Sequence, residues 1–333
     1  MKIKNAKILA AALSFGLIFA GCSNDEGADT STETKTEDAA KTDDSAKTDD
    51  SAKTDDAAKA PEEKKEETDT ASAEDYDFTV VSREDGSGTR GAFIEIVGLE
   101  EEVDGAKEDM TTQDAVVQNS TNGVMQTVSK DANAIGYISL GSLNDTVKAL
   151  KVDGVEATEE TIADGSYKIA RPFNLAYKES ELDDLSKDFL KYVKSEEAQK
   201  LVLEEGYVPL KETEAYEASG AEGTITVAGS TSVTPLMEKM VEEYQKLNPD
   251  AKIEIQSTGS SSGIEACIDG AAQIAMASRE LKDEEKEKLQ VSVIATDGIA
   301  VVVNKDSKLE DVSVDQLKEI FNGTIKNTSE LEK

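Results

Sequence analysis

The stretch VVSREDGSGTRGAFIEIV, residues 80–97, places a strand, a glycine-rich turn and a helix in direct succession. The β-branched run that closes at Val81 indicates a strand. After the turn, Phe93, Ile94 and Val97 share one face, which indicates an amphipathic helix. Because backbone N–H groups are free at the start of a helix, this layout can hold an anion.

The turn carries the residue types that an oxyanion site needs. Ser87 and Thr89 supply hydroxyl donors, and Gly88 lets the backbone approach closely. Arg83 adds a planar, two-pronged donor. A Ser/Thr/Gly turn before a helix can also be a simple N-cap, so this stretch alone leaves both interpretations open.

The same pattern occurs twice more along the chain. TITVAGSTSVTPL, from Thr224, predicts a strand, a turn with Ser232 and a helix. KIEIQSTGSSSGIEACI, from Lys252, predicts a strand, a turn with Ser260 and Ser261, and another helix. Three hydroxyl-bearing helix starts in one α/β chain favour a single shared anion site.

Two further polar turns follow or precede predicted elements. QIAMASREL, from Gln273, predicts a strand that ends at Ser278 and Arg279. Residues 119–122 form a polar turn before a predicted helix at 121–130. This last turn could face a ligand, but a simple cap explains it as well.

The composition excludes several kinds of chemistry. The chain has no histidine, which excludes Ser-His-Asp and Cys-His catalysis and any histidine-based metal site. Cys267, on an apolar helical face, is more typical of a core residue than of a nucleophile. The net charge of −34 argues against nucleic acid or anionic lipid as a partner. We therefore expect no catalytic residues, no cofactor and no metal.

The first 75 residues differ from the rest. Residues 1–22 combine three lysines, a short apolar run and small residues before Cys22, which is typical of a bacterial lipoprotein signal peptide. A plain signal peptide or an uncleaved anchor is the alternative. Residues 23–75 contain KTDDSA at 41 and 47 and few apolar residues, which predicts a disordered acidic tether.

The remaining chain alternates predicted strands and helices, so an α/β fold is expected. VSVIATDGIAVVVNK, from Val291, is a long β-branched run that predicts strands passing between two lobes, with a crossover at 296–303. Residues 211–223 are rich in Glu, Ala and Gly and predict a connector.

Together, AGSTSVTPL, STGSSSGIEACIDG, MASREL, DGIAVVVN and SREDGSGTRGAF resemble the phosphate-binding lipoproteins of bacterial ABC-type phosphate uptake systems. That resemblance implies a two-lobed, type II periplasmic-binding-protein fold with a ligand cleft between the lobes. The segment order differs from the family's, because the segment resembling TITVAGSTS normally comes first. The chain therefore resembles a circular permutant, the alternative being a truncated or recombined product that does not fold.

A permuted order implies a particular division of the chain. We expect a split lobe at 76–146 and 305–333, and a continuous lobe at 147–304 that contains the 211–223 connector. The resemblance further implies that phosphate is held from both lobes, by Arg83, Ser87, Gly88, Thr89, Ser232, Val233, Ser260 and Ser261.

The resemblance leaves the acceptor for the phosphate proton open. Well-characterised members place an aspartate where this sequence has Ser278, so Ser278 and Asp85 are the candidates. Phosphate near neutral pH keeps a proton and sulfate does not, so an acceptor decides which anion is preferred.

The expected function is capture of inorganic phosphate outside the cytoplasm, by a monomer anchored to the membrane through lipid on Cys22, for an ABC-type permease. Three alternatives stay open. They are a binder of sulfate or molybdate, a phosphatase or other hydrolase, and a surface or signalling protein with a vestigial site.

Overall fold

The three predicted strand–turn–helix units all form in the structure, a computed structural model that describes residues 75–103 and 106–331. The expected signal peptide with Cys22, and the expected tether up to residue 74, lie outside the described residues. The three units are β1 (Thr79–Arg83) with α1 (Gly88–Ile96), β9 (Gly223–Gly229) with α6 (Thr234–Leu247), and β10 (Ala251–Ser257) with α7 (Ser260–Ile268).

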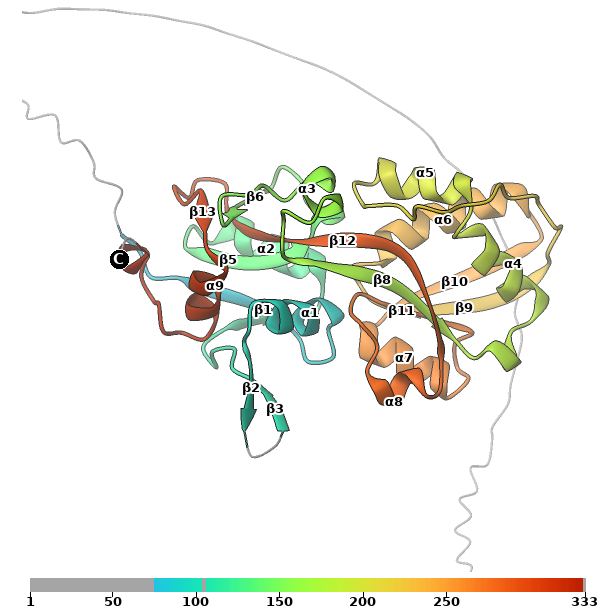
Figure 1. Cartoon of the computed structure of the whole chain (residues 1–333), viewed down its shortest axis with the longest axis horizontal. Coiled ribbons are helices and arrows are strands. Elements are labelled where there is room, and N and C mark those ends of the chain that lie inside the picture. The colour runs from blue at the N-terminus through green and yellow to red at the C-terminus, as the bar shows by residue number, and fades with distance from the viewer. Residues whose placement is uncertain (1–74, 104–105, 332–333) are drawn as a thin grey trace, which may run out of the picture. The chain divides into compact units, whose positions relative to one another are not determined.

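The strands form a mixed sheet in the order β10-β9-β11-β8-β12-β5-β1-β4, with β6 beside β12 (Figure 1). Each end of this sheet repeats one pattern: β9 lies between β10 and β11, and β1 between β4 and β5, all in parallel. Parallel strands followed by helices bring the helix starts to one edge of the sheet. The strands not yet bounded are β4 (Val116–Gln118), β5 (Ala134–Ser139), β6 (Val147–Ala149), β8 (Ala170–Tyr177), β11 (Ile274–Ala277) and β12 (Gln290–Asn304).

The other elements cover this sheet or project from it. The helices are α2 (Thr121–Lys130), α3 (Glu159–Ala163), α4 (Asp184–Tyr192), α5 (Glu196–Glu204), α8 (Asp283–Lys286) and α9 (Val314–Phe321). The strands β7 (Lys151–Val152) and β13 (Asp311–Val312) pair with each other, and β2 (Glu100–Val103) and β3 (Ala106–Asp109) form a hairpin. The sequence does not predict that hairpin, because its residues are charged and carry no apolar alternation.

Separate hydrophobic cores define two lobes. In lobe A, α1 packs Phe93 against Tyr137 of β5, with ring centroids 4.1 Å apart, and Phe321 of α9 packs against both rings. In lobe B, Phe189 of α4 packs edge-on against Tyr244 of α6, with centroids 5.1 Å apart. Burial of such aromatic groups is a main source of stability for each lobe.

The lobe boundaries differ from the expected ones. Residues 147–169 contribute Leu150, Ile162 and Tyr167 to the core of lobe A, together with Ile299 from the far end of β12. Lobe A therefore comprises residues 76–169 and 299–331, and lobe B residues 170–298. The expected boundaries at 147 and 304 came from the resemblance, and the structure differs because β6 pairs with the lobe A end of β12 and residues 150–169 pack into the core of lobe A.

Two antiparallel strands connect the lobes. β12 pairs with β8 up to Gly298 and with β5 from Ile299 onward, so a single strand runs through both lobes. This confirms the crossover that the β-branched run predicted. β8 and β12 form the only strand connection between the lobes within the described residues.

The described chain ends lie side by side in lobe A (Figure 1). The backbone N–H of Thr328 donates to the carbonyl of Tyr76 at 3.0 Å, and Phe78 donates to the carbonyl of Lys326 at 2.8 Å. At the other end of the molecule, the 211–223 connector is anchored by Tyr216, whose hydroxyl donates to the carboxylate of Asp188. The connector is thus packed onto lobe B rather than being a loose linker.

Candidate functional site

The start of α1 is built from a tight turn and a side-chain cap. Ser87 is the N-cap, and its hydroxyl accepts a hydrogen bond from the backbone N–H of Arg90 at 3.3 Å. Gly86 has a φ of 82°, a conformation that favours glycine, and turns the chain into the helix. Ser87, Gly88 and Thr89 are all buried.

The helix starts of lobe B face this turn. The hydroxyl of Ser230 accepts hydrogen bonds from the N–H groups of Ser232 and Val233, at 3.2 and 3.4 Å, and so shapes the turn before α6. Gly259, with a φ of 92°, precedes Ser260 at the start of α7. Ser232 and Ser260 are both fully buried.

The three helix starts meet between the lobes. The hydroxyls of Thr89 and Ser232 lie 2.8 Å apart, and the N–H of Ser261 donates to the carbonyl of Gly86 at 3.1 Å. A Cβ on Gly88 would collide with the Ser260 hydroxyl. Hydroxyls and helix N-termini from both lobes therefore surround one small region. This is the arrangement expected if the starts of α1, α6 and α7 share one anion site.

Arg83 lies at the end of β1 and is only 1% exposed. Its Nε and Nη2 donate to the two carboxylate oxygens of Glu84, each at 2.8 Å, and Nη2 also donates to the hydroxyl of Thr231 from lobe B at 3.0 Å. The guanidinium is thereby held in one orientation at the boundary between lobes. The guanidinium of Arg90 also donates a hydrogen bond to the backbone carbonyl of Arg83, at 3.0 Å.

The two candidate proton acceptors behave differently. Ser278 is buried in the group, where its hydroxyl lies 2.9 Å from that of Ser230 and 3.5 Å from that of Ser260. Asp85 is exposed, and its carboxylate accepts from the N–H of Gly86. The structure therefore places Ser278 in the hydroxyl cluster and Asp85 outside it, because the Asp85 side chain folds back onto its own turn.

One residue of the cluster was left undecided by the sequence. The hydroxyl of Thr121, at the start of α2, lies 3.1 Å from that of Ser232. The turn at 119–122 therefore reaches the site as well as capping a helix. The hydroxyl cluster consists of Thr89, Thr121, Ser230, Ser232, Ser260 and Ser278.

A buried ion pair links the crossing strands at the boundary between the lobes. Arg171 of β8 donates through Nε and Nη2 to Asp297 of β12, at 3.2 and 3.0 Å, and both side chains are almost fully buried. The hydroxyl of Ser139 and the N–H of Leu140, from lobe A, donate to the other carboxylate oxygen. Burial raises the pKa of Asp297 to about 6, although the adjacent Arg171 acts to lower it.

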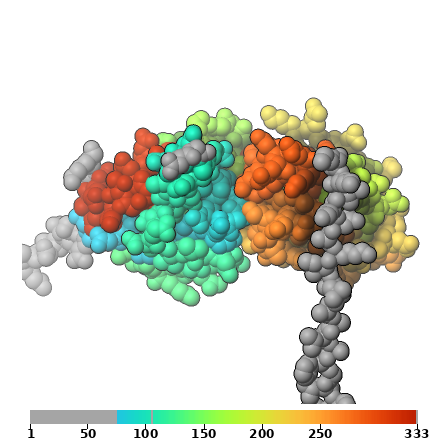
Figure 2. Space-filling model, turned by 90° about the horizontal axis from the view of Figure 1, so that it is seen from below, coloured from blue at the N-terminus to red at the C-terminus, as the bar shows by residue number. Residues whose placement is uncertain are grey.

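A cleft of about 800 Å³ opens beside the hydroxyl cluster. Figure 2 shows residues near 90, in cyan, meeting residues near 280, in orange, across this boundary. Its walls carry Arg90 and Lys107 from lobe A and Arg279 and Lys282 from lobe B, together with several carboxylates. Arg279 is itself paired with Glu285, at 2.8 Å, so the mouth of the cleft is polar and of mixed charge.

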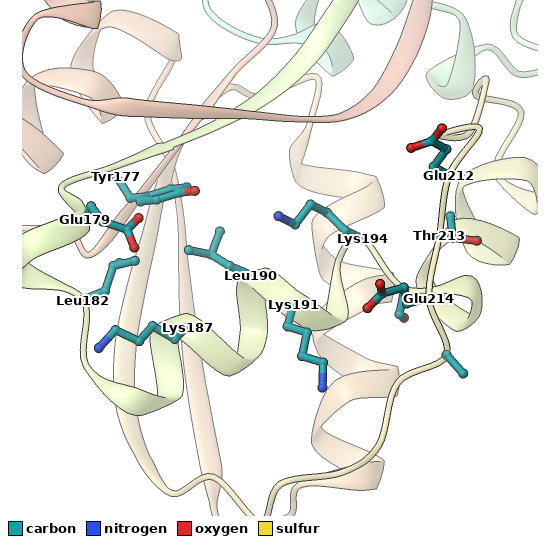
Figure 3. A pocket seen from close by; sticks show the side chains of 12 residues that line it. Tyr177, Glu179, Leu182, Lys187, Leu190, Lys191, Lys194, Glu212, Thr213 and Glu214 are labelled. Atoms are coloured by element: carbon teal, nitrogen blue, oxygen red, sulfur yellow. The ribbon is translucent and has the colours of Figure 1, made fainter.

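A second hollow, of about 590 Å³, lies on lobe B between α4 and the connector. Figure 3 shows Lys187 and Lys191 on α4, and Glu212 and Glu214 on the connector. No helix-start hydroxyl of the cluster lines it, and its walls carry both signs of charge. It lacks the converging donors that mark the interlobe site.

No group of three or more Cys, Asp or Glu side chains in residues 75–103 and 106–331 is arranged to hold a metal ion. Cys267 is buried, and burial raises the pKa of its thiol, which fits a core residue. None of the described helices is both long enough and apolar enough to cross a membrane.

Two lobes joined by crossing strands, with polar helix starts between them, define the class of two-lobed binding proteins. A family model described as a PBP superfamily domain matches residues 63–197 and 214–331. The phosphate-binding protein PstS 2 of Streptococcus agalactiae is 51% identical over 267 residues, which cover 80% of this chain and 91% of the relative. The chain therefore belongs to the PBP superfamily and, within it, to the family of these phosphate-binding proteins.

Two other similarities differ in extent. A crystal structure of a phosphate-binding protein of a phosphate ABC transporter from Streptococcus pneumoniae is 46% identical, with a TM-score of 0.63, and the match covers 77% of this chain and 99% of that one. The phosphate-binding protein PstS of Bacillus subtilis is 38% identical over 116 residues, which cover 33% of this chain and 38% of the relative.

Proposed function

We propose that this protein captures inorganic phosphate between its two lobes and delivers it to an ABC-type importer. The observation that carries the proposal is the contact between the hydroxyls of Thr89 and Ser232, 2.8 Å apart and contributed by different lobes. A site made from both lobes is formed only when they close. The names of the similar proteins from Streptococcus support the choice of phosphate.

In this proposal each helix start contributes donors to the anion. Ser87, Gly88 and Thr89 act from lobe A, and Ser232, Val233, Ser260, Ser261 and Ser278 act from lobe B. Arg83 is the full positive charge. Each hydrogen bond to a charged group contributes about 1.5–3 kcal/mol, so several of them outweigh the repulsion from a distant, screened net charge.

Asp85 is no part of this proposed shell, because its carboxylate is exposed and bonded to its own turn. The hydroxyl cluster contains no carboxylate, and the carboxylate of Glu84 is engaged by Arg83. This observation favours one second candidate, a binder of a fully deprotonated oxyanion such as sulfate or molybdate. The same donor-rich site supports binding rather than catalysis, so we propose no enzymatic activity.

The proposal extends to the parts of the chain outside the described residues. We propose that Cys22 carries lipid, that residues 23–75 tether the lobes, and that the protein acts as a monomer on the outer face of the cell membrane. The basis is the sequence pattern of residues 1–75.

Calorimetric titration of the purified protein with phosphate and with sulfate tests the main proposal. We expect phosphate to bind and Arg83→Ala to weaken binding about 100-fold, because the guanidinium can no longer donate through Nη1, the nitrogen that is not bonded to Glu84. Arg83→Lys keeps the charge but loses the planar guanidinium that Glu84 holds in place, and its affinity should fall between those of the wild type and Arg83→Ala. A folded protein that ignores phosphate, or an Arg83→Ala variant with unchanged affinity and unchanged thermal stability, would contradict it.

A further inference from the structure

The hydroxyl of Thr121 is directed toward lobe B rather than used to cap its own helix. Ser120 is the N-cap of α2, and its hydroxyl accepts from the N–H of Gly123 at 3.1 Å. Thr121 is only 4% exposed, and its Oγ1 lies 3.1 Å from Oγ of Ser232. The Thr121 hydroxyl is therefore not needed to cap α2, and its contact with Ser232 is not explained by helix formation.

Ser232 lies between two threonines from lobe A. Its Oγ is 2.8 Å from that of Thr89 and 3.1 Å from that of Thr121. A hydroxyl has one hydrogen and two lone pairs, so Ser232 can donate in at most one of these contacts. At least one threonine therefore donates to Ser232 and keeps its own lone pairs available for another hydrogen.

Neither of the two carboxylates described above is hydrogen-bonded to a hydroxyl of the cluster. Both oxygens of Glu84 accept from Arg83, and Asp297 accepts from Arg171, Ser139 and Leu140. A hydrogen phosphate ion needs one acceptor for the proton that it carries. Within the described residues, the acceptors remaining in the cluster are the hydroxyl lone pairs.

We propose that Thr121 is the residue that accepts this proton in a hydrogen bond and so favours phosphate over sulfate; this rests on the proposed function. Thr121 donates its hydrogen to Ser232, and a lone pair of its Oγ1 accepts from the protonated oxygen of hydrogen phosphate. Ser232 in turn donates to another ligand oxygen. Sulfate has no proton at near-neutral pH. A sulfate oxygen would therefore face the lone pair of Thr121 with no hydrogen between them, and sulfate should bind less well than phosphate.

The test uses the full chain and calorimetric titration with sodium phosphate and sodium sulfate. Thr121→Val keeps the shape but removes the hydroxyl, Thr121→Ser keeps the hydroxyl, and Thr127→Val is the matched control. Thr127 lies on the same helix and donates to the carbonyl of Gly123, away from the cluster. We expect Thr121→Val to weaken phosphate binding about tenfold, or about 1.4 kcal/mol.

Sulfate binding by Thr121→Val should be unchanged or tighter, and the other two variants should stay within twofold of the wild type for both anions. Four results would overturn the proposal. They are phosphate affinity of Thr121→Val within twofold of wild type, an equal loss for both anions, an equal loss in Thr121→Ser, and an equal loss in Thr127→Val. A wild-type protein that ignores phosphate would overturn the proposed function as well, whereas the other results leave that function standing.

Discussion

Gly88 brings the backbone of α1 closer to lobe B than any side chain would allow. A Cβ at this position would collide with the hydroxyl of Ser260 and would lie 2.7 Å from that of Ser278. Both serines are fully buried, so they have little room to move. Gly91 lies one turn further along α1. A Cβ at this position would lie 3.4 Å from the flexible side chain of Arg279, which can move aside.

Gly88→Ala should therefore hold the lobes apart. We expect a loss of phosphate affinity of at least tenfold with little change in unfolding temperature, because the helical backbone at this position accepts alanine. Gly91→Ala is the control and should bind phosphate normally. Calorimetry together with thermal unfolding measures both effects, and equal affinities for the two variants would show that Gly88 does not limit closure.

The site residues that could be predicted from the sequence are those that lie in a strand–turn–helix motif. Arg83, Thr89, Ser232 and Ser260 each follow a predicted strand and precede a predicted helix, so periodicity located them. Thr121 lies in a polar turn before a predicted helix with no predicted strand in front of it, and nothing in the sequence separates a capping turn from one that faces another lobe. That distinction depends on which side of the helix contacts lobe B, which only the fold decides.

The element that connects the lobes, the β8–β12 strand pair, carries the buried Arg171–Asp297 ion pair in direct register. Burial lowers the pKa of Arg171, and Asp297 acts to raise it. A carboxyl whose pKa is raised in the folded protein binds protons more tightly there than in the unfolded chain, where the value is about 3.9. Its contribution to stability is therefore present below about pH 4 and is lost as the pH rises through about 6.

Replacing Arg171 by Met should enlarge this pH dependence. Without its counter-charge, ionised Asp297 is left buried, which costs about 3 kcal/mol at pH 7.5. The pKa of Asp297 then rises further, so the carboxyl is neutral at pH 5 and the loss becomes smaller. Urea unfolding of both proteins at the two pH values measures the difference.

An exposed ion pair provides the control for this prediction. Glu181 pairs with Lys178 at 3.0 Å and is about half exposed, so Glu181→Ala should change the unfolding free energy by less than about 1 kcal/mol at either pH. A loss in Arg171→Met that is as large at pH 5 as at pH 7.5 would contradict the assigned role of Asp297.

At the scale of elements, long patterned segments were predictable and short ones were not. The β-branched run of β12 indicated a crossing strand because few other structures accommodate so long an apolar, branched segment. The short strands β6 and β7 belong to lobe A, and only the packing of Leu150 and Ile162 decides this. The anchoring of the connector by Tyr216 was missed for the same reason, since one aromatic residue carries no periodicity.

At the scale of the whole molecule, the two described ends of the chain meet in lobe A. Tyr76 and Thr328 are hydrogen-bonded to each other, so the ends could be joined with little rearrangement. The match to the S. agalactiae relative runs through 91% of that protein, whereas the match to the B. subtilis relative stops at 38%. We propose that the chain is a circular permutant of the order expected for its family, because a difference in segment order would limit a match to part of both chains.

Restoring the family's usual order tests this proposal. The change joins Leu331 to Asp75 through a short Gly/Ser linker and opens the chain between Ser219 and Glu222, in a mostly exposed segment that leaves Tyr216 in place. Because both lobes keep their strands and their crossing pair, we expect the rearranged protein to fold and to bind phosphate within about threefold of the original. A small loss of stability is expected, since the chain ends move to a new position. As the control, the same opening without the new join gives two fragments, which should bind only when mixed. If the rearranged chain fails to fold while the original folds, the present order is required for the structure, and an exchange of segment order alone cannot account for this molecule.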